Sequence, residues 1–249
     1  TACINPVKHY KLPVGLLNPA DPADFILVKD LVHFEVSSTY INGELVAENG
    51  ISKINSVPIT AINNFDCKKI KPAILVVPEN EYPNKNGLIP VIEALDGQLI
   101  TNKLMLAGTL QNSNWVTDTT NDILKIVVVN RYHAAPIAKA FIKNFGITYG
   151  AIASSVAHDS HNIVAVGVDD ESIAAAINLV IEKGGGVSVV TSANNHATNS
   201  VLPLPVAGLM SSADGFEVAA GFADCVAAGF VACADSVVAG VGSDVEGVV

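Results

Sequence analysis

Polar side chains that could do chemistry are concentrated in the stretch ASSVAHDSHNIVAVG, residues 153–167, between two runs that are almost wholly apolar. The flanking runs, GAIASSVA and NIVAVGV, have the composition of strands, so the polar residues between them form either a turn or a site. A turn needs only one or two polar side chains to bond local backbone groups. Here two imidazoles, a carboxylate and several hydroxyl groups come together, and this density favours a functional site. The members of the cluster are Ser154, Ser155, His158, Asp159, Ser160, His161 and Asn162.

Three kinds of chemistry are open to this cluster. His158 and His161 stand three residues apart around Asp159, so they could ligate a metal ion. The stretch does not supply the three or four ligands of a complete site, and His133 and His196 could complete it only from elsewhere, so a metal site in this chain alone is disfavoured but stays open. A Ser-His-Asp nucleophilic triad is disfavoured because the G-x-S-x-G nucleophile elbow is absent. The remaining role is ligand contact or proton relay in an active site whose main machinery lies elsewhere.

A second candidate lies at the end of the strand-like run DILKIVVVNR, residues 122–131. Asn130, Arg131, Tyr132 and His133 follow its β-branched core, at a place where binding residues gather. Arginine and tyrosine also close strand ends structurally, so both interpretations stay open. We take Arg131 as the candidate ligand-binding residue of this group.

The elements around the cluster alternate between strand and helix. Residues 163–168 predict a strand, a helix capped by Asp170 follows, and VSVVTS begins the next strand. The glycines at 184–186 follow that helix instead of opening one, so they are interpreted as its C-cap and not as a phosphate-binding loop. This order indicates a βαβ-like arrangement. The apolar spacing in APIAKAFIKNFG, residues 135–146, predicts a further helix.

The first part of the chain has a different pattern. Residues 5–17 predict a short helix followed by a loop, and Asn42-Gly43 between two β-prone runs predicts a hairpin. Residues 52–90 contain five prolines and predict a linker with strand pieces, and residues 217–234 a helix weakened by glycine. The sequence therefore predicts an α+β protein: an α/β-like C-terminal domain with a mixed sheet and packed helices, preceded by a small β-unit.

Composition excludes several classes of partner. A formal net charge of −10 argues against binding to nucleic acid, because phosphate contacts need a concentrated basic surface. Every apolar run is broken before it could span a membrane, so we expect no membrane partner. The four cysteines are scattered, as in a cytoplasmic protein with reduced, mostly buried thiols. The chain opens with TACINPVKHY instead of a start methionine, and we expect it to be a piece of a longer protein.

Several of these motifs together resemble one known family. GAIASSVAHDSHNIVAVG, followed by a capped helix, KGGGVSVV and LPLPVAGLMS, is similar to the C-terminal domain of the adenine deaminases of the amidohydrolase superfamily. NPVKHYKLPVGLLNPADPADFILVKDL and TYINGELVAENG look like the segment of those enzymes that leaves the catalytic barrel and completes their small β-domain, and DILKIVVVNRYH also fits the pattern. The resemblance covers roughly residues 2–211.

The resemblance implies a metal-dependent hydrolase of cytoplasmic purine salvage that deaminates adenine to hypoxanthine and ammonia, with a metal-activated water attacking the ring. The metal, manganese or iron, would be bound by a barrel that precedes Thr1, so no cofactor is expected in this chain and the chain alone is expected to be inactive. It also implies a division into residues 1–71, the end of the barrel and the β-domain segment, and residues 72–249, the C-terminal α/β domain. The expected partners are adenine, the N-terminal amidohydrolase barrel and further copies of the protein in a homo-oligomer.

Within this resemblance the polar cluster is expected at the mouth of the active site. His158, Asp159 and His161 would orient or polarise the substrate as catalytic residues. The expected substrate-binding residues are Ser154, Ser155, Asn162 and Arg131. The chain departs from the family at Tyr132, where a histidine is usual, and after Ser212, where Ala, Gly and Val replace a proline-containing strand and a charged helix. The alternative function is a non-catalytic binding or oligomerisation module in which the SSVAHDSHN turn is structural.

Overall fold

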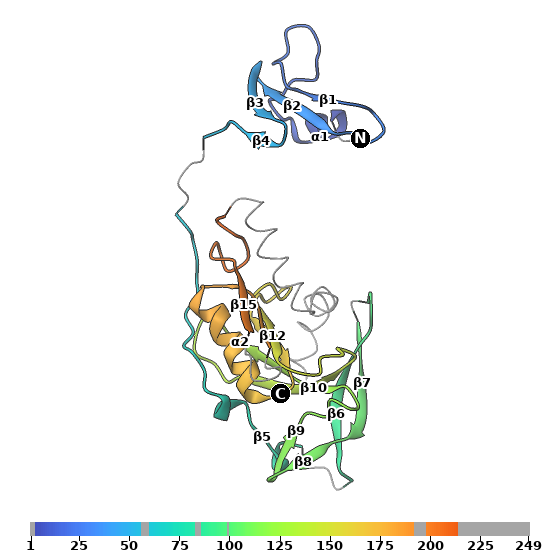
Figure 1. Ribbon diagram of the computed structural model, residues 1–249, viewed down its shortest axis with the longest axis vertical. Helices are drawn as coiled ribbons and strands as arrows, with labels where there is room; N and C mark the ends of the chain where they lie inside the picture. The colour runs from blue at the N-terminus through green and yellow to red at the C-terminus, as the bar shows by residue number, and fades with distance from the viewer. Residues whose placement is uncertain (1–2, 56–59, 83–85, 99, 192–197, 214–249) are drawn as a thin grey trace. The chain divides into compact units, whose positions relative to one another are not determined.

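The computed structural model describes residues 3–55, 60–82, 86–98, 100–191 and 198–213 (Figure 1). The chain divides into two compact units, Thr1–Ile59 and Thr60–Val249, here called unit 1 and unit 2. The division falls before the boundary at 71/72 that we expected from the sequence, because the residues just before Pro72 pack on unit 2. Among the described residues no helix is long and apolar enough to cross a membrane.

Unit 1 is a small antiparallel sheet with one helix. The predicted hairpin is confirmed, since two paired strands flank Asn42 and Gly43, both at the positive φ that such a turn requires. Asp24 fixes the turn, because its carboxylate accepts the N–H groups of Asn42 and Gly15, each at 2.7 Å. These two bonds lower the pKa of Asp24. The elements are α1 (Ile4–Tyr10), β1 (Phe25–Val28), β2 (Val36–Ile41), β3 (Glu44–Glu48) and β4 (Ile51–Ser52), and the strands pair in that order.

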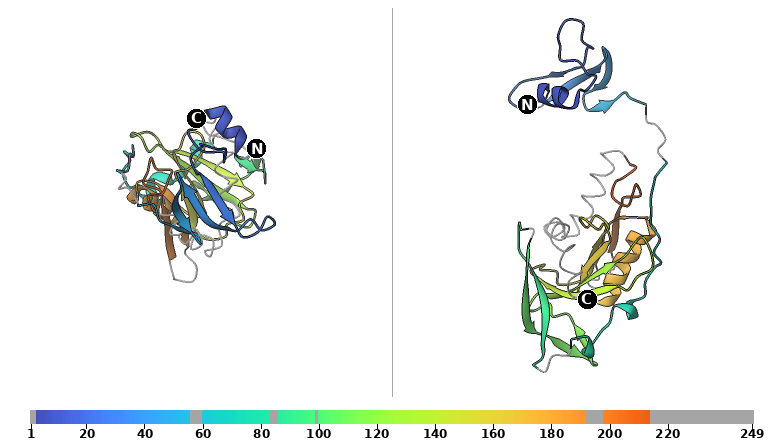
Figure 2. Two further views of the ribbon diagram at one scale, coloured as in Figure 1. Left: turned by 90° about the horizontal axis from the view of Figure 1, so that it is seen from above. Right: turned by 180° about the vertical axis from the view of Figure 1, so that it is seen from behind.

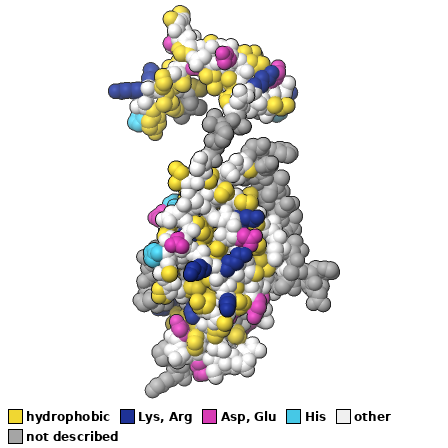
Figure 3. Space-filling view, turned by 90° about the vertical axis from the view of Figure 1, so that its left-hand side faces the viewer, with side chains coloured by type: hydrophobic (Ala, Val, Ile, Leu, Met, Phe, Trp, Pro, Cys, Tyr) yellow, Lys and Arg dark blue, Asp and Glu magenta, His cyan; other side chains and the backbone are white. Residues whose placement is uncertain are grey.

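Unit 1 has no core of its own among its described residues, none of which is buried. Leu31 and Val32 are 83% and 86% exposed, and hydrophobic side chains gather on the surface of unit 1 in Figure 3. A sheet this small needs a packed apolar face to be stable in water. The described residues of unit 1 therefore leave its apolar side chains without a packed core.

Unit 2 is built on a mixed sheet of eight strands in the order β15-β14-β12-β13-β10-β11-β6-β7. β11 and β6 pair in parallel, and the other neighbours pair antiparallel. The strands are β6 (Leu88–Ala94), β7 (Thr101–Ala107), β10 (Ile123–Val129), β11 (Ala138–Lys143), β12 (Ala151–Ser154), β13 (Ile163–Gly167), β14 (Gly186–Thr191) and β15 (Thr198–Pro203). A second, three-stranded sheet contains β5 (Val77–Pro78), β9 (Asn114–Val116) and β8 (Thr109–Gln111), and η1 (Pro72–Leu75) and η2 (Glu79–Glu81) are short 3-10 helices. This mixed sheet with packed helices confirms the α+β class.

The strand–helix–strand unit predicted after the polar cluster is present. β13 leads into α2 (Asp170–Glu182), which leads into β14. Both strands pair antiparallel with β12 and are therefore parallel to each other, with β12 between them. α2 packs along β12, β13 and β14. Figure 1 shows the helix beside β12, and Figure 2 shows the same unit from above and from behind.

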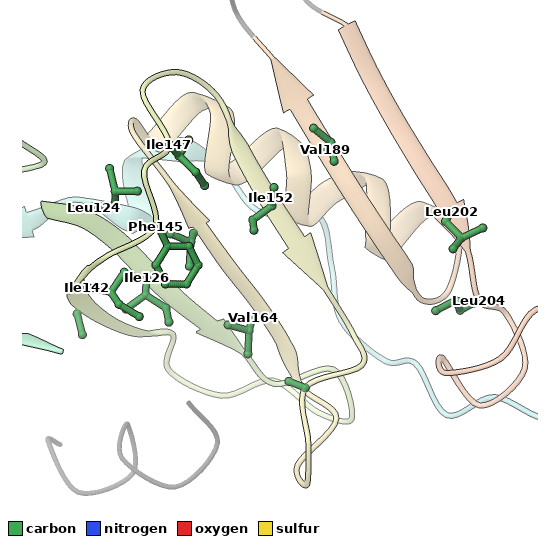
Figure 4. Close-up of a cluster of buried hydrophobic side chains, with 13 residues drawn as sticks. Leu124, Ile126, Ile142, Phe145, Ile147, Ile152, Val164, Val189, Leu202 and Leu204 are labelled. Atoms are coloured by element: carbon green, nitrogen blue, oxygen red, sulfur yellow. The ribbon is translucent and has the colours of Figure 1, made fainter. Parts of the chain in front are cut away.

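Both faces of the sheet are apolar, so neighbouring residues of β10 enter different cores. Val127 and Val129 point to the core under α2, which includes Ile173, Ile177 and Val180. Leu124 and Ile126 point to the opposite core (Figure 4). Lys125 lies on the α2 face with only 4% of its surface exposed, which makes it an exception that requires a partner.

The helix predicted for residues 135–146 is wrong, because this segment forms β11. Phe141 and Ile142 are adjacent and fully buried in different cores, an arrangement that a strand allows because successive side chains point to opposite faces. The apolar residues fit a helical period by their spacing, but pairing with β10 on one side and β6 on the other determines the outcome.

The boundaries of α2 correct one prediction and confirm another. Asp169, not Asp170, is the N-cap: it accepts the N–H of Ser172 at 2.6 Å, and Asp170 is the first helical residue. At the other end, Gly184 and Gly185 donate to the carbonyls of Ile181 and Val180, the Schellman pattern, so the glycines end the helix as predicted. The predicted helix over 217–234 lies outside the described residues.

Residues 60–71 contain no helix or strand but are attached to unit 2. Ile70 exchanges two hydrogen bonds with the side chain of Asn178, of 2.8 and 2.9 Å, and Lys69 pairs with Glu182 at 2.7 Å. Phe65, Cys67 and Ile70 pack against the core under α2. These residues are therefore part of unit 2 and not a free linker.

We expect removal of residues 1–71 to destabilise unit 2 more than removal of residues 1–59. The longer deletion removes several hydrogen bonds worth about 1 kcal/mol each and three partly buried apolar side chains, so the free energy of unfolding should fall by about 2–4 kcal/mol. Urea denaturation of the two truncated chains measures the difference. Equal midpoints would mean that these contacts add nothing.

Candidate functional site

The polar cluster lies on the loop that joins β12 to β13, residues 155–162, here called the HDSH loop. β12 and β13 form an antiparallel hairpin across this loop, since Ser154 pairs with Val164. At the far end of the loop the N–H of His161 donates to the carbonyl of Ala157 at 2.6 Å, which closes a tight turn. His161 itself has a φ of 52°, in the left-handed region that histidine adopts uncommonly.

The tip of the HDSH loop carries three titratable side chains close together. The side chains of His158 and Asp159 are 71% and 89% exposed and contact each other through Nδ1 and Oδ1. The rings of His158 and His161 lie 5.9 Å apart, edge to face. The structure thus brings the three predicted catalytic residues together, with His158 and Asp159 facing solvent in this chain.

The serines at the base of the loop bond to protein groups instead of facing a ligand. Ser155 is fully buried, and its hydroxyl accepts the N–H of Gly186 at 2.9 Å and donates to the carbonyl of Gly208 at 2.6 Å. The hydroxyl of Ser154 accepts the N–H of Val156 at 3.0 Å. These contacts support the loop-holding part of the expectation for the serines, and direct contact with a purine stays a prediction.

Two polar atoms of the loop point inward without a partner. Among the described residues, His161 Nδ1 and Asn162 Oδ1 are the buried side-chain atoms that have no hydrogen-bond partner. A buried polar atom that is not bonded is costly, and such atoms are often reserved for a ligand or for water. His161 and Asn162 are therefore the cluster members whose hydrogen-bonding capacity remains available within the fold.

Arg131, at the end of β10, connects the HDSH loop to three other segments. The side chain is 3% exposed, and each guanidinium nitrogen has an acceptor within the chain. Nε donates to the carbonyl of His161 at 2.6 Å, and Nη2 donates to the carbonyl of Ala207 at 2.8 Å. The guanidinium group also lies 4.5 Å from the ring centre of Tyr132 and 5.3 Å from that of Phe65. We call this arrangement the Arg131 clasp; a direct contact of Arg131 with a substrate stays a prediction.

Gly208 contributes to the clasp by having no side chain. A Cβ placed on Gly208 would lie 2.4 Å from Nη1 of Arg131, and its φ of 72° also favours glycine. Neither Gly208 nor Ala207 was predicted from the sequence as part of the site. The Leu-Pro repeat before them signals a stiff turn, but nothing in the sequence shows that the turn meets Arg131.

The thiols only partly match the expectation of buried, reduced cysteines. Cys67 is half-buried, and Cys3 is exposed; both are free. Burial raises the pKa of the Cys67 thiol, which keeps it protonated, although the nearby charge of Arg131 acts in the opposite direction. Cys225 and Cys233 lie outside the described residues.

The described residues do not fit a metal site. No group of three or more histidine, cysteine, aspartate or glutamate side chains in this part of the chain is arranged to hold a metal ion. At the loop tip, the side chains of His158 and Asp159 contact each other. No chemical step is therefore assigned to a metal held by these residues.

Comparison with known proteins matches residues 98–235 to a family model described as the adenine deaminase C-terminal domain. A protein named adenine deaminase from Borreliella afzelii is 46% identical over 219 residues, which is 88% of this chain and 38% of that protein. One from Methanosarcina acetivorans is 49% identical over 223 residues, and one from Salinibacter ruber is 44% identical over 211 residues; these matches cover 88% and 84% of this chain and 40% and 37% of those proteins. The chain thus spans about two fifths of the length of the relatives that it matches.

Proposed function

The chain belongs to the adenine deaminase family, and from this we propose that it is the C-terminal part of an enzyme that deaminates adenine at a site to which the HDSH loop contributes. The observation that carries the proposal is the grouping of His158, Asp159 and His161 on one loop whose backbone is held by a buried arginine. A loop that only reversed the chain would not need three titratable side chains or a guanidinium group behind it.

In the proposed reaction, the oxygen of a water molecule bonds to C6 of adenine and the bond from C6 to the amino nitrogen breaks. The leaving nitrogen takes one proton of the water and departs as ammonia, and the other proton remains on the ring of hypoxanthine. We assign to His161 and Asp159 the orientation of the purine and the transfer of the proton to the leaving nitrogen. Asn162 is assigned to hydrogen bonding with the purine edge, because its Oδ1 has no partner within the described fold.

The rest of the active site is proposed to lie in an N-terminal amidohydrolase barrel. Support comes from unit 1, whose described residues include none that is buried, so that it lacks a core until another segment covers it. The relatives are also much longer than this chain. The manganese or iron ion that the family resemblance implies is proposed to be held by the barrel, and no step given to this chain uses it. A place in cytoplasmic purine salvage and a homo-oligomeric state belong to the same proposal.

The test is adenine turnover by the protein that carries this chain together with its barrel, here called the barrel-containing protein. We expect hypoxanthine and ammonia to appear in equal amounts, and we expect no turnover by the 249-residue chain alone, with manganese or iron added. Failure of the barrel-containing protein to consume adenine, with the metal bound, would refute the proposal. Turnover by the isolated chain would show that the barrel is not required.

The second candidate is a binding or oligomerisation module. It is favoured by the use of Ser155 and Arg131 in contacts within the chain. In that case the barrel-containing protein should keep its kcat when the loop-tip residues are replaced, but its mass in solution should fall to that of a monomer. Kinetics and mass measured on the same variants separate the two functions.

A further inference from the structure

Two neighbouring residues at the end of β10 hold two neighbouring carbonyls of the HDSH loop. Nε of Arg131 donates to the carbonyl of His161 at 2.6 Å, and the hydroxyl of Tyr132 donates to the carbonyl of Ser160 at 3.3 Å. The two side chains are themselves joined, because Nη2 of Arg131 donates to the Tyr132 hydroxyl at 3.0 Å. The loop is therefore fixed by one connected group of donors just before Asn162.

The backbone at His161 depends on these contacts. A non-glycine residue in the left-handed region persists where the surrounding structure fixes it on more than one side. The N–H of His161 is bonded to Ala157 and its carbonyl to Arg131, each at 2.6 Å. Because the backbone is held on both sides of the Cα atom, these bonds fix the direction of the Cα–Cβ bond from which the imidazole extends.

The donors have little freedom to move. The guanidinium group of Arg131 is bonded to the carbonyl of Ala207, lies 5.3 Å from the ring centre of Phe65 and leaves no room for a Cβ atom at Gly208. The amide of Tyr132 is held by the side chain of Asn130 at 2.9 Å. The clasp thus joins the end of β10 to the HDSH loop through several contacts at once.

We propose that Arg131 and Tyr132 are positioning residues that fix the imidazole of His161 in the orientation that acts on the purine. In this role they act through the two loop carbonyls. This inference rests on the proposed function, because it requires that His161 takes part in adenine deamination.

The test removes the Tyr132 hydroxyl alone. In the barrel-containing protein, Tyr132→Phe should lower kcat for adenine about 10-fold to 100-fold with KM nearly unchanged, as expected for a misplaced group. Arg131→Lys should lower it further, because a lysine cannot reproduce the fork of donors. Tyr10→Phe, an exposed tyrosine of unit 1, is the matched control and should leave kcat unchanged.

A double-mutant cycle separates positioning from general stability. If Tyr132 acts through His161, adding Tyr132→Phe to His161→Ala should cause no further loss of kcat. Hydrogen exchange of residues 156–162, measured on the same proteins, should become faster in Tyr132→Phe and not in Tyr10→Phe. This readout does not depend on turnover, so it tests the clasp even if adenine is not the substrate.

Each outcome has one meaning. Faster exchange in the loop together with a non-additive loss of kcat supports the inference. Unchanged exchange, or faster exchange with a normal kcat, overturns it while leaving the proposed function in place. An additive loss of kcat in the double variant also overturns it, since Tyr132 would then act independently of His161. Absence of adenine turnover in the unsubstituted barrel-containing protein instead refutes the proposed function.

Discussion

Replacement of His161 by alanine in the barrel-containing protein is expected to lower kcat/KM for adenine by about 100-fold to 10,000-fold, the range that a general acid or base contributes. Its ring lies against that of His158, and its Nδ1 is buried without a partner. Truncation to alanine removes no hydrogen bond that the side chain makes within the described fold, so the stability of the protein should change little. Steady-state kinetics with adenine, together with a thermal melt, measure both effects.

His33→Ala is the matched control, because His33 is an exposed histidine on unit 1 that contacts only the neighbouring Asp30 among the described residues. Asp159→Asn tests the carboxylate in the same way, since it keeps the size of the side chain and removes the charge. We expect Asp159→Asn to reduce kcat and His33→Ala to leave it unchanged. Normal kinetics in both His161→Ala and Asp159→Asn would show that the HDSH loop takes no part in the reaction.

The largest expected effect on stability comes from Asp170. Its carboxylate accepts a hydrogen bond from Lys125 Nζ, whose only other partner among the described residues is the carbonyl of Leu75 at 3.1 Å. Asp170→Ala leaves a buried ammonium group without its counter-charge, so the free energy of unfolding should fall by about 3–5 kcal/mol. Chemical denaturation of the 249-residue chain measures the change.

Two further variants make this prediction specific. Glu171→Ala removes a neighbouring, exposed acidic residue from the same turn of α2 and should cost less than about 1 kcal/mol. The double variant Lys125→Met with Asp170→Ala replaces both charges and should recover much of the lost stability. If Asp170→Ala costs no more than Glu171→Ala, the buried pair does not contribute as argued.

Local patterns in the sequence were sufficient to predict those elements that a few consecutive residues determine. The Asn42-Gly43 hairpin, the β10 strand and the glycine end of α2 all follow from a few consecutive residues. The strand β11 was missed because its apolar spacing also fits a helix, and the decision depends on pairing with strands elsewhere in the chain. The N-cap was misplaced by one residue because two aspartates are adjacent, and only the geometry shows that Asp169 caps while Asp170 pairs with Lys125.

The polar residues of the candidate site could be predicted from the sequence, but the contacts that hold the HDSH loop in place could not. The density of imidazole and carboxyl groups in the sequence predicts His158, Asp159 and His161 as site residues, and the structure shows that they lie together on one loop. The contacts that hold the loop come from residues far away in the sequence, such as Ala207, 76 residues after Arg131. The two prolines before Ala207 and the glycine after it predict a turn. They do not indicate that this turn contacts Arg131, because that contact depends on the fold and not on the neighbouring residues.

The most direct test of the account is a crystal structure of the barrel-containing protein with adenine or a slowly reacting analogue bound. We predict that the HDSH loop faces the barrel and that an atom of His161 or Asp159 lies within hydrogen-bond reach of the purine, about 2.6–3.2 Å or through one water. A structure in which the loop tip points to bulk solvent, on a surface that no barrel approaches, would contradict the account.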